Sequence, residues 1–318
     1  MINRIQTYIL IVFISIFSLI SSVNAELKVV ASIKPLHSLT SYLMDGVGKP
    51  DVIVDGYNSP HNFSLKPSHA KMLENADLVI WVGENLETFL EKPLNTIAKK
   101  AKNIEIMDLK GIKKLEFREK NIFEEHDEHG HDEHKEHDEH KEKDSHEGHA
   151  HGKHDPHVWL DPINAKLIIK EITKQLVQLD AKNSSVYKSN SKKALAEMDN
   201  LIQTIQKDLN KDLRFVVFHD AYQYFENRFG IQVLGALTVN TDVMPGAEQL
   251  SEIREVIEHE KVNCLFSEPQ FNPAIIKSIA KDTNVKIGIL DPLGAKLNKG
   301  KNLYFNLLKD MSSSFKGC

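Results

Sequence analysis

The residues best suited to bind metal ions are concentrated in one acidic stretch, where ten of the sixteen histidines lie between positions 126 and 154. Neutral imidazole binds zinc, copper and nickel, and the interleaved carboxylates add oxygen ligands. Flexible ligands lose chain entropy when they bind, so we expect auxiliary, low-affinity metal binding here. The alternative is a solvated polar linker. The ten residues are His126, His129, His131, His134, His137, His140, His146, His149, His151 and His154.

A tight site needs ligands held at fixed geometry, and four other residues have a suitable context. His61 lies in a turn-rich loop after a predicted strand, and His157 lies in the proline-restricted segment Asp155–Pro162. His219 and Asp291 each follow an apolar predicted strand directly. Ligands of open α/β sheets bind beyond the carboxyl ends of the strands. Each residue alone could be a hydrogen-bonded structural residue, but together they predict a metal site between two halves of the chain.

The elements that would position these residues follow an α/β pattern. Short runs rich in Val and Ile alternate with longer amphipathic stretches, which predicts two similar lobes, each with a mainly parallel sheet flanked by helices. The predicted strands are Lys28–Ile33, Asp51–Asp55, Asp77–Val82 and Ile104–Met107, then Arg214–Phe218, Gln232–Leu237, Cys264–Phe266 and Val285–Leu290. The metal site is then expected in the cleft between the lobes.

The middle of the chain divides these two α/β units. Ala165–Leu179 and Ser184–Asn210 lack internal Gly and Pro and repeat apolar residues at helical spacing, so we predict two helices. We assign residues 26–182 to an N-terminal lobe, 183–210 to a rigid linking helix and 211–318 to a C-terminal lobe. The loop 121–154 within the first lobe carries mostly charged residues and histidine, and we expect it to be disordered.

The N-terminus resembles a secretory signal. Arg4 precedes the apolar run Tyr8–Ile20, and Val23 and Ala25 supply small residues for cleavage after Ala25. The apolar run is shorter than the ~20 residues that span a bilayer, which disfavours a membrane anchor. No cysteine near the cleavage point could carry a lipid. We therefore expect a periplasmic protein that is not embedded in the membrane.

Charge and cysteine content narrow the class further. The net charge of −5 argues against a nucleic-acid partner. The only cysteines are Cys264 and Cys318, and in an oxidising compartment such a pair is best interpreted as one disulfide. Two free thiols would suit a cytosolic protein, which conflicts with the predicted signal peptide.

Several dispersed segments together resemble a known family. They are Ala31–Ser38, Ser59–Ser68, Asn75–Gly83, Asp155–Pro162, Phe218–Glu226, Ser267–Gln270 and Leu290–Gly294. In order along the chain, they look like the periplasmic zinc-binding proteins of high-affinity zinc ABC transporters, a branch of the metal-binding solute-binding proteins.

The resemblance implies a ligand set and a set of partners. His61, His157 and His219 would bind Zn²⁺, with Asp291 or water in the fourth position. It also implies a histidine-rich loop before the second ligand, a long helix between lobes and a disulfide matching Cys264–Cys318. The partners would be the zinc ion, as transported substrate, and an inner-membrane ABC permease with its cytoplasmic ATPase. We expect the protein to act as a monomer.

Three alternative functions stay open on the residues alone. A protein of the same transporter type could bind manganese or another divalent metal, although three imidazoles suit zinc better. A zinc hydrolase would also use three histidines and an exchangeable position. No His-Glu-x-x-His motif or nucleophile elbow accompanies the histidines, so we expect no enzyme activity. A zinc buffer or adhesin with no transporter would share the same site.

Overall fold

The computed structural model describes residues 26–123, 153–239, 241, 243 and 245–318. The predicted signal peptide and nine of the ten tract histidines lie outside these residues; His154 lies within them. None of the helices in the described residues has the length and hydropathy needed to cross a membrane.

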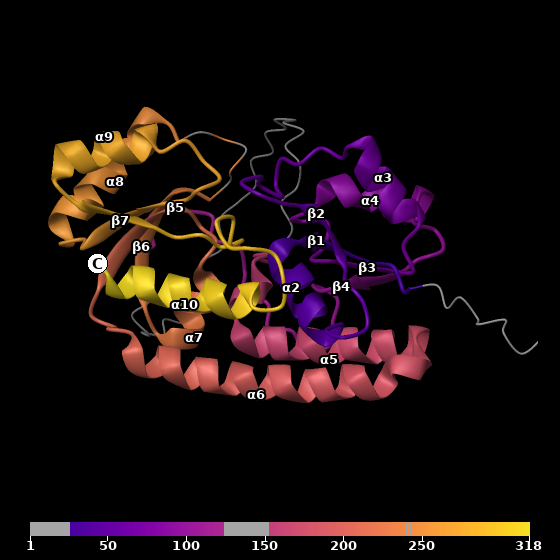
Figure 1. The fold of residues 1–318 in the computed structure, drawn as a ribbon. Helices are drawn as coiled ribbons and strands as arrows, with labels where there is room; N and C mark the ends of the chain where they lie inside the picture. Colours follow the sequence, from indigo (N-terminus) through magenta and orange to yellow (C-terminus); the bar gives the residue numbers. More distant parts are fainter. Residues whose placement is uncertain (1–25, 124–152, 240, 242, 244) are drawn as a thin grey trace, which may run out of the picture.

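The first lobe is built on a four-stranded parallel sheet in the order β2-β1-β3-β4. Its strands are β1 (Val29–Ile33), β2 (Asp51–Val54), β3 (Leu78–Trp81) and β4 (Lys102–Glu105). Every residue of β1 and β3 is buried, as expected when helices cover both faces of a parallel sheet. Helices α3 (Pro67–Glu74) and α4 (Thr88–Thr96) lie on one side, and α2 (Lys34–Leu43) lies on the other (Figure 1).

The second lobe repeats this design with strand order β6-β5-β7-β8. Its strands are β5 (Arg214–His219), β6 (Gln232–Thr238), β7 (Cys264–Ser267) and β8 (Lys286–Ile289). Its helices are α7 (Gln223–Phe229), α8 (Ala247–His259), α9 (Ala274–Thr283) and α10 (Leu303–Lys316). A disulfide joins Cys264 at the start of β7 to Cys318 after α10, which is the predicted pair. The predicted fold class of two parallel α/β lobes is confirmed.

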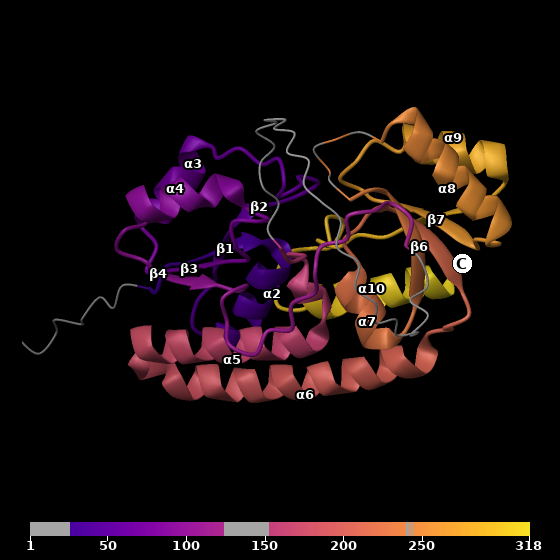
Figure 2. The same cartoon turned by 180° about the vertical axis from the view of Figure 1, so that it is seen from behind.

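Two long helices form a layer beneath the lobes: one spans both lobes and the other lies beneath the first (Figures 1 and 2). They are α5 (Pro162–Leu179) and α6 (Ser184–Asp208), close to the predicted bounds. Asp161 caps α5 by accepting a hydrogen bond from the Ile163 N–H at 2.8 Å, and Pro162 occupies the first turn. Helix α6 packs against α2 of the first lobe and α10 of the second. One continuous hydrophobic core therefore joins the two sheets through this helical layer.

The segment before the histidine-rich tract crosses to the second sheet. Asn121 O accepts a hydrogen bond from Ala236 N at 2.8 Å, and Phe123 N donates one to Leu234 O at 2.9 Å. A Cβ atom on Gly235 would lie 2.7 Å from Asn121 O, so this close approach requires glycine. The sequence pattern grouped residues 121–123 with the first lobe, whereas in space they extend the outer edge of β6.

Candidate metal centre

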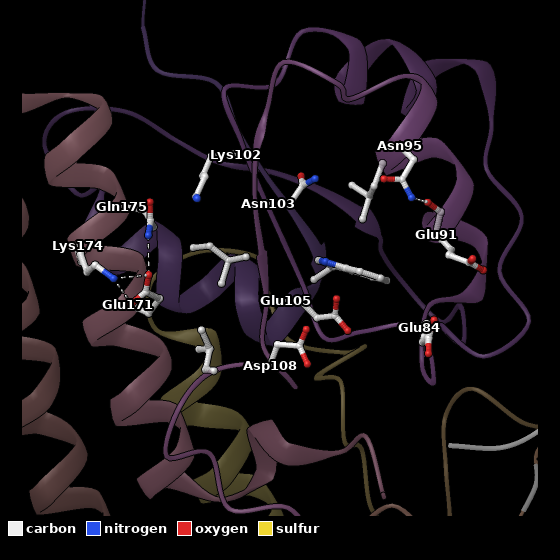
Figure 3. Close-up of a pocket in the computed structure, with 14 residues that line it drawn as sticks. Glu84, Glu91, Asn95, Lys102, Asn103, Glu105, Asp108, Glu171, Lys174 and Gln175 are labelled. Carbon is white, nitrogen blue, oxygen red and sulfur yellow. Dashed lines mark hydrogen bonds and ion pairs between the residues drawn. The ribbon is translucent and has the colours of Figure 1, made fainter. Parts of the chain in front are cut away.

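A polar cavity of about 740 Å³ lies beside α4, β4 and α5 of the first lobe (Figure 3). Its carboxylates repel one another when ionised. Burial, together with the nearby Asp108 and Glu84 carboxylates, raises the pKa of Glu105 to about 7. No histidine lines this cavity, and its carboxylates do not form a group of three with ligand atoms close together. The cavity is therefore not the metal centre.

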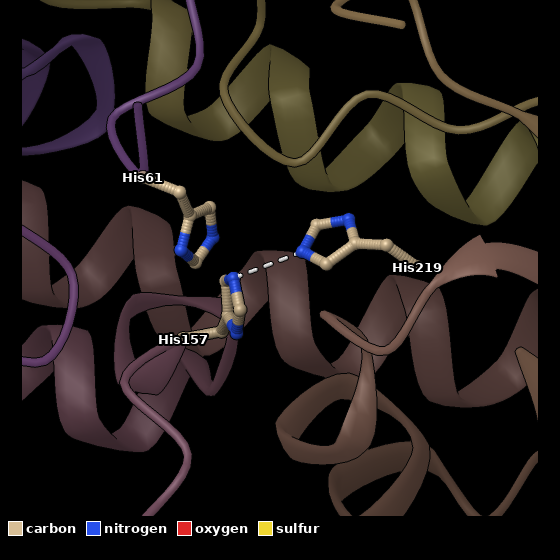
Figure 4. Close-up of side chains that lie close together, drawn as sticks. All are labelled: His61, His157 and His219. Carbon is tan, nitrogen blue, oxygen red and sulfur yellow. Dashed lines mark hydrogen bonds between the residues drawn. The ribbon is translucent and has the colours of Figure 1, made fainter. Parts of the chain in front are cut away.

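Three histidines converge between the lobes (Figure 4). His61 comes from the loop after β2, His157 directly precedes a 3₁₀ turn (Val158–Leu160) at the start of α5, and His219 ends β5. One ring nitrogen from each lies within 4.8 Å of the others, and this is the only such group of three among the described residues. The Nε2 atoms of His157 and His219 are 3.3 Å apart. Two ligands of a tetrahedral zinc ion, each about 2.05 Å from the metal, are about 3.3 Å apart.

A carboxylate holds each of the two buried rings. Asp155 Oδ1 lies 2.7 Å from His157 Nδ1 and also accepts a hydrogen bond from the His157 backbone N–H at 2.9 Å. Glu268 Oε1 lies 2.8 Å from His219 Nδ1. When Nδ1–H donates to a carboxylate, Nε2 keeps its lone pair for a metal. Both Nε2 atoms therefore face the cluster as ligand atoms.

Glu268 lies just after the predicted strand Cys264–Phe266, where a carboxylate can orient a ligand on the neighbouring strand, whereas no role was predicted for Asp155. The available signal was the short spacing in Asp155-Pro156-His157, which places a carboxylate two residues before a ligand in a segment with little backbone freedom.

Burial and charge shift the two buried histidines in opposite directions. Burial lowers the pKa of His157 well below its ordinary value, and the neighbouring His219 lowers it further. Burial also lowers the pKa of His219, but the carboxylates of Glu268, Asp220 and Asp155 outweigh burial and raise it overall. Burial raises the pKa of Asp155 to about 7. His157 is therefore already in the neutral form that a metal requires.

The space inside the histidine cluster fits a single ion or water molecule. The free volume is about 10 Å³, close to the minimum for one water molecule. Its walls include Pro60, Trp159, Phe271 and Leu293, so most of the lining around the imidazoles is apolar. The Trp159 ring centroid lies 5.3 Å from that of His157, and its Nε1–H donates to Pro292 O at 2.9 Å. An apolar lining of this kind lowers the local dielectric constant and so strengthens the electrostatic attraction between a metal ion and its ligands.

The fourth predicted ligand lies outside the three-histidine group. Asp291 Oδ1 accepts hydrogen bonds from Gln270 Nε2 at 2.9 Å and from the Leu293 N–H at 3.2 Å. Its part in metal binding stays a prediction. His154, the described member of the tract, lies in an antiparallel bridge with Glu116, next to the segment that leads to His157.

A fold of two parallel α/β lobes on a shared helical layer, with imidazoles converging between them, defines a metal-binding solute-binding protein. Residues 29–318 match the family described as zinc-uptake complex component A, periplasmic (ZnuA), and the chain belongs to this family.

Relatives agree with this assignment, and solved structures share the fold. The chain is 46% identical over 303 residues to the high-affinity zinc uptake system protein ZnuA of Brucella abortus, with 91% of each chain covered. It is 38% identical over 298 residues to the protein of that name from Yersinia pestis, with 92% of each covered. A ZnuA crystal structure superposes with a TM-score of 0.74 at 23% identity, covering 92% of this chain and 98% of the other. A manganese-bound periplasmic metal-binding protein from Candidatus Liberibacter asiaticus gives 0.72 at 20% identity, covering 92% and 98%.

Proposed function

We propose that this chain captures zinc in the periplasm and delivers it to the permease of an ABC importer, whose ATPase supplies the energy. The observation that carries the proposal is the convergence of three imidazoles, two of them at the spacing of tetrahedral zinc ligands. Relatives at 46% and 38% identity are named as high-affinity zinc uptake proteins, which supports the same cargo.

We assign His61, His157 and His219 as the zinc ligands, with Asp291 or a water molecule in the fourth position. An all-imidazole triad favours zinc over manganese, because manganese prefers oxygen ligands. X-ray absorption of the zinc-loaded protein should report three nitrogens and one oxygen. An unchanged spectrum for Asp291→Asn would assign the oxygen to water, whereas loss of the oxygen shell or its replacement would assign it to Asp291.

Export, the histidine-rich tract and the absence of enzyme activity complete the proposed function. The signal peptide is cleaved after Ala25, the mature chain is a monomer, and the histidines of residues 126–154 are weaker sites that meet the metal first. The protein does not act as a hydrolase, because the space of about 10 Å³ at the cluster leaves no room for an organic substrate beside an ion. Zinc-dependent turnover of ester or peptide substrates would contradict this.

Calorimetry tests the main site directly. A variant lacking residues 126–151 keeps the Glu116–His154 bridge and should retain one tight zinc site. Replacing His61, His157 and His219 by alanine in that background should weaken zinc binding at least 100-fold. His259→Ala, an exposed histidine on α8, is the matched control and should bind like the parent. Tight one-to-one zinc binding by the triple variant would disprove the assignment.

Growth of a deletion strain under metal chelation tests delivery. The wild-type gene should restore zinc accumulation and the triple-alanine gene should not. Equal accumulation with either gene would favour a buffer or adhesin role over delivery to an importer.

A further inference from the structure

A second cavity lies beside the metal centre and opens between the lobes. It has a volume of about 450 Å³ and is lined by Tyr57 of the first lobe and by residues around β8 and α9 of the second. Tyr57, Ile287 and Ile289 are 57%, 42% and 48% exposed, and they are three of the seven large hydrophobic side chains with strong exposure among the described residues. Clustering of exposed apolar side chains in one groove is typical of a binding surface.

The groove runs along an edge strand. Strand β8 is at the edge of its sheet and pairs only with β7 in the described part of the chain. Residues at i and i+2 of a strand point to the same face, so Ile287 and Ile289 project together beside α9. Gly288 faces the opposite side, where a Cβ atom would lie 2.2 Å from the Phe266 ring. The edge therefore offers free backbone groups and two isoleucines to a partner.

One turn forms the wall between the groove and the metal centre. Glu268 and Phe271 line both cavities. The Glu268 carboxylate holds His219, and the Phe271 ring centroid lies 5.8 Å from that of His219. The Phe271 ring also stacks on Phe218, the residue before His219, with centroids 4.7 Å apart. A molecule seated in the groove would touch the same turn that supports the third imidazole.

Charge indicates which partner the groove accepts. Lys277 and Lys296 line it, and neither forms an ion pair with another described residue. The one carboxylate in the lining, Glu268, is already bonded to His219. A second copy of this chain, docked symmetrically, would bring lysines toward lysines, which disfavours self-association. An apolar segment flanked by carboxylates is complementary to this surface.

We propose that this groove, formed by Tyr57, Phe271, Ile287, Ile289 and the two lysines, is the docking surface for the periplasmic face of the importer's permease. The inference rests on the proposed zinc-delivery function, because the permease is the protein that must approach the metal centre. Contact with Phe271 displaces the Glu268–Phe271 turn. His219 then loses its carboxylate support, and the ion is released toward the partner.

Paired substitutions in the full mature chain test the docking surface. I287E together with I289E places two carboxylates against the partner's apolar segment and close to its flanking carboxylates, and should lower zinc uptake at least tenfold in a host lacking its own copy of the gene. The matched control is I97E with L179E, since these side chains are 37% and 42% exposed outside the groove. The control should support uptake within twofold of wild type. Zinc affinity by calorimetry should stay within twofold for both pairs.

Three outcomes would overturn the docking proposal. The first is zinc uptake by the groove variant equal to that of the control pair. The second is a loss of zinc affinity in the groove variant, because the groove would then belong to the metal site alone. The third outcome comes from photo-crosslinking with a benzophenone amino acid at position 289. Irradiation in cells should yield an adduct that mass spectrometry identifies as the permease. An adduct with a second copy of this chain would contradict the docking proposal. If wild type itself supports no zinc uptake, the delivery function fails, and the docking proposal fails with it.

Discussion

The carboxylate of Glu268 lies 2.8 Å from Nδ1 of His219, although 49 residues separate them in sequence. His219 ends β5 and Glu268 follows β7, and these two strands are neighbours in the second sheet. Adjacent parallel strands end at the same edge, so the sheet itself brings the ligand and its support together. The position of His219 is therefore set by the sheet, and the carboxylate that supports its ring comes from the turn directly after the neighbouring strand.

Removing this support should weaken zinc binding without unfolding the protein. Glu268→Ala leaves His219 free to rotate, and loss of such a carboxylate typically costs about 10- to 100-fold in metal affinity. Glu268→Gln keeps an acceptor for Nδ1–H and should recover most of that loss. Competition with a chromophoric chelator would measure both affinities, with Glu258→Ala on the exposed side of α8 as control. Equal affinities for the alanine variant and wild type would contradict the positioning role.

Stability should fall as pH rises because of a buried carboxyl group in the first lobe. Glu87 Oε2 accepts hydrogen bonds from the N–H groups of Val82 and Gly83, and burial raises the pKa of Glu87 to about 7. The folded protein then binds more protons than the unfolded chain between about pH 4.5 and 7, so the free energy of unfolding decreases across that range. The shift of the Glu87 pKa corresponds to a decrease of about 3 kcal/mol in the free energy of unfolding.

Glu87→Gln removes this titration. Between pH 5 and pH 8, the free energy of unfolding of wild type should decrease by about 2–3 kcal/mol more than that of the variant. Denaturant titrations at the two pH values measure the difference, and Glu91→Gln on the exposed face of α4 should behave like wild type. The same pH dependence in the Glu87 variant and wild type would disprove the prediction.

The disulfide should stabilise the second lobe. It closes a loop with a sequence separation of 54, for which the chain-entropy model gives about 4 kcal/mol. Replacing Cys264 and Cys318 by serine should lower the free energy of unfolding by about that amount. Denaturation of wild type with reductant should match the double variant, and reductant should not affect the variant. An unchanged unfolding midpoint on reduction would contradict the prediction.

A buried lysine should hold the lobes against each other. Lys34 at the start of α2 donates hydrogen bonds from Nζ to the carbonyl oxygens of Gly294, Ala295 and Leu297 at 2.7, 3.0 and 2.9 Å. Lys34→Met removes the donors and leaves buried carbonyls without partners, which should cost about 1–3 kcal/mol of unfolding free energy. Thermal and chemical denaturation measure the loss, with the exposed Lys49→Met as control. Equal losses in both variants would show that the contact does not stabilise the fold.

Local patterns in the sequence determined the class of fold and most of its elements. The alternation of Val- and Ile-rich runs with amphipathic stretches predicted eight parallel strands, and the structure has them within a few residues of the predicted bounds. Periodicity depends on neighbours along the chain, so it can be read without knowing the tertiary contacts. The same patterns placed His61, His157 and His219 at loop starts and strand ends, where ligands of α/β folds bind.

Which of these residues meet was decided only by tertiary structure. His157 and His219 are 62 residues apart, yet their Nε2 atoms are 3.3 Å apart because two sheets and a shared helical layer return the chain to one point. The same packing brings Asp291 within hydrogen-bond distance of Gln270 and places Asn121–Phe123 at the edge of the second sheet. Such contacts depend on loop conformation and side-chain packing across the whole molecule, and no local pattern encodes them.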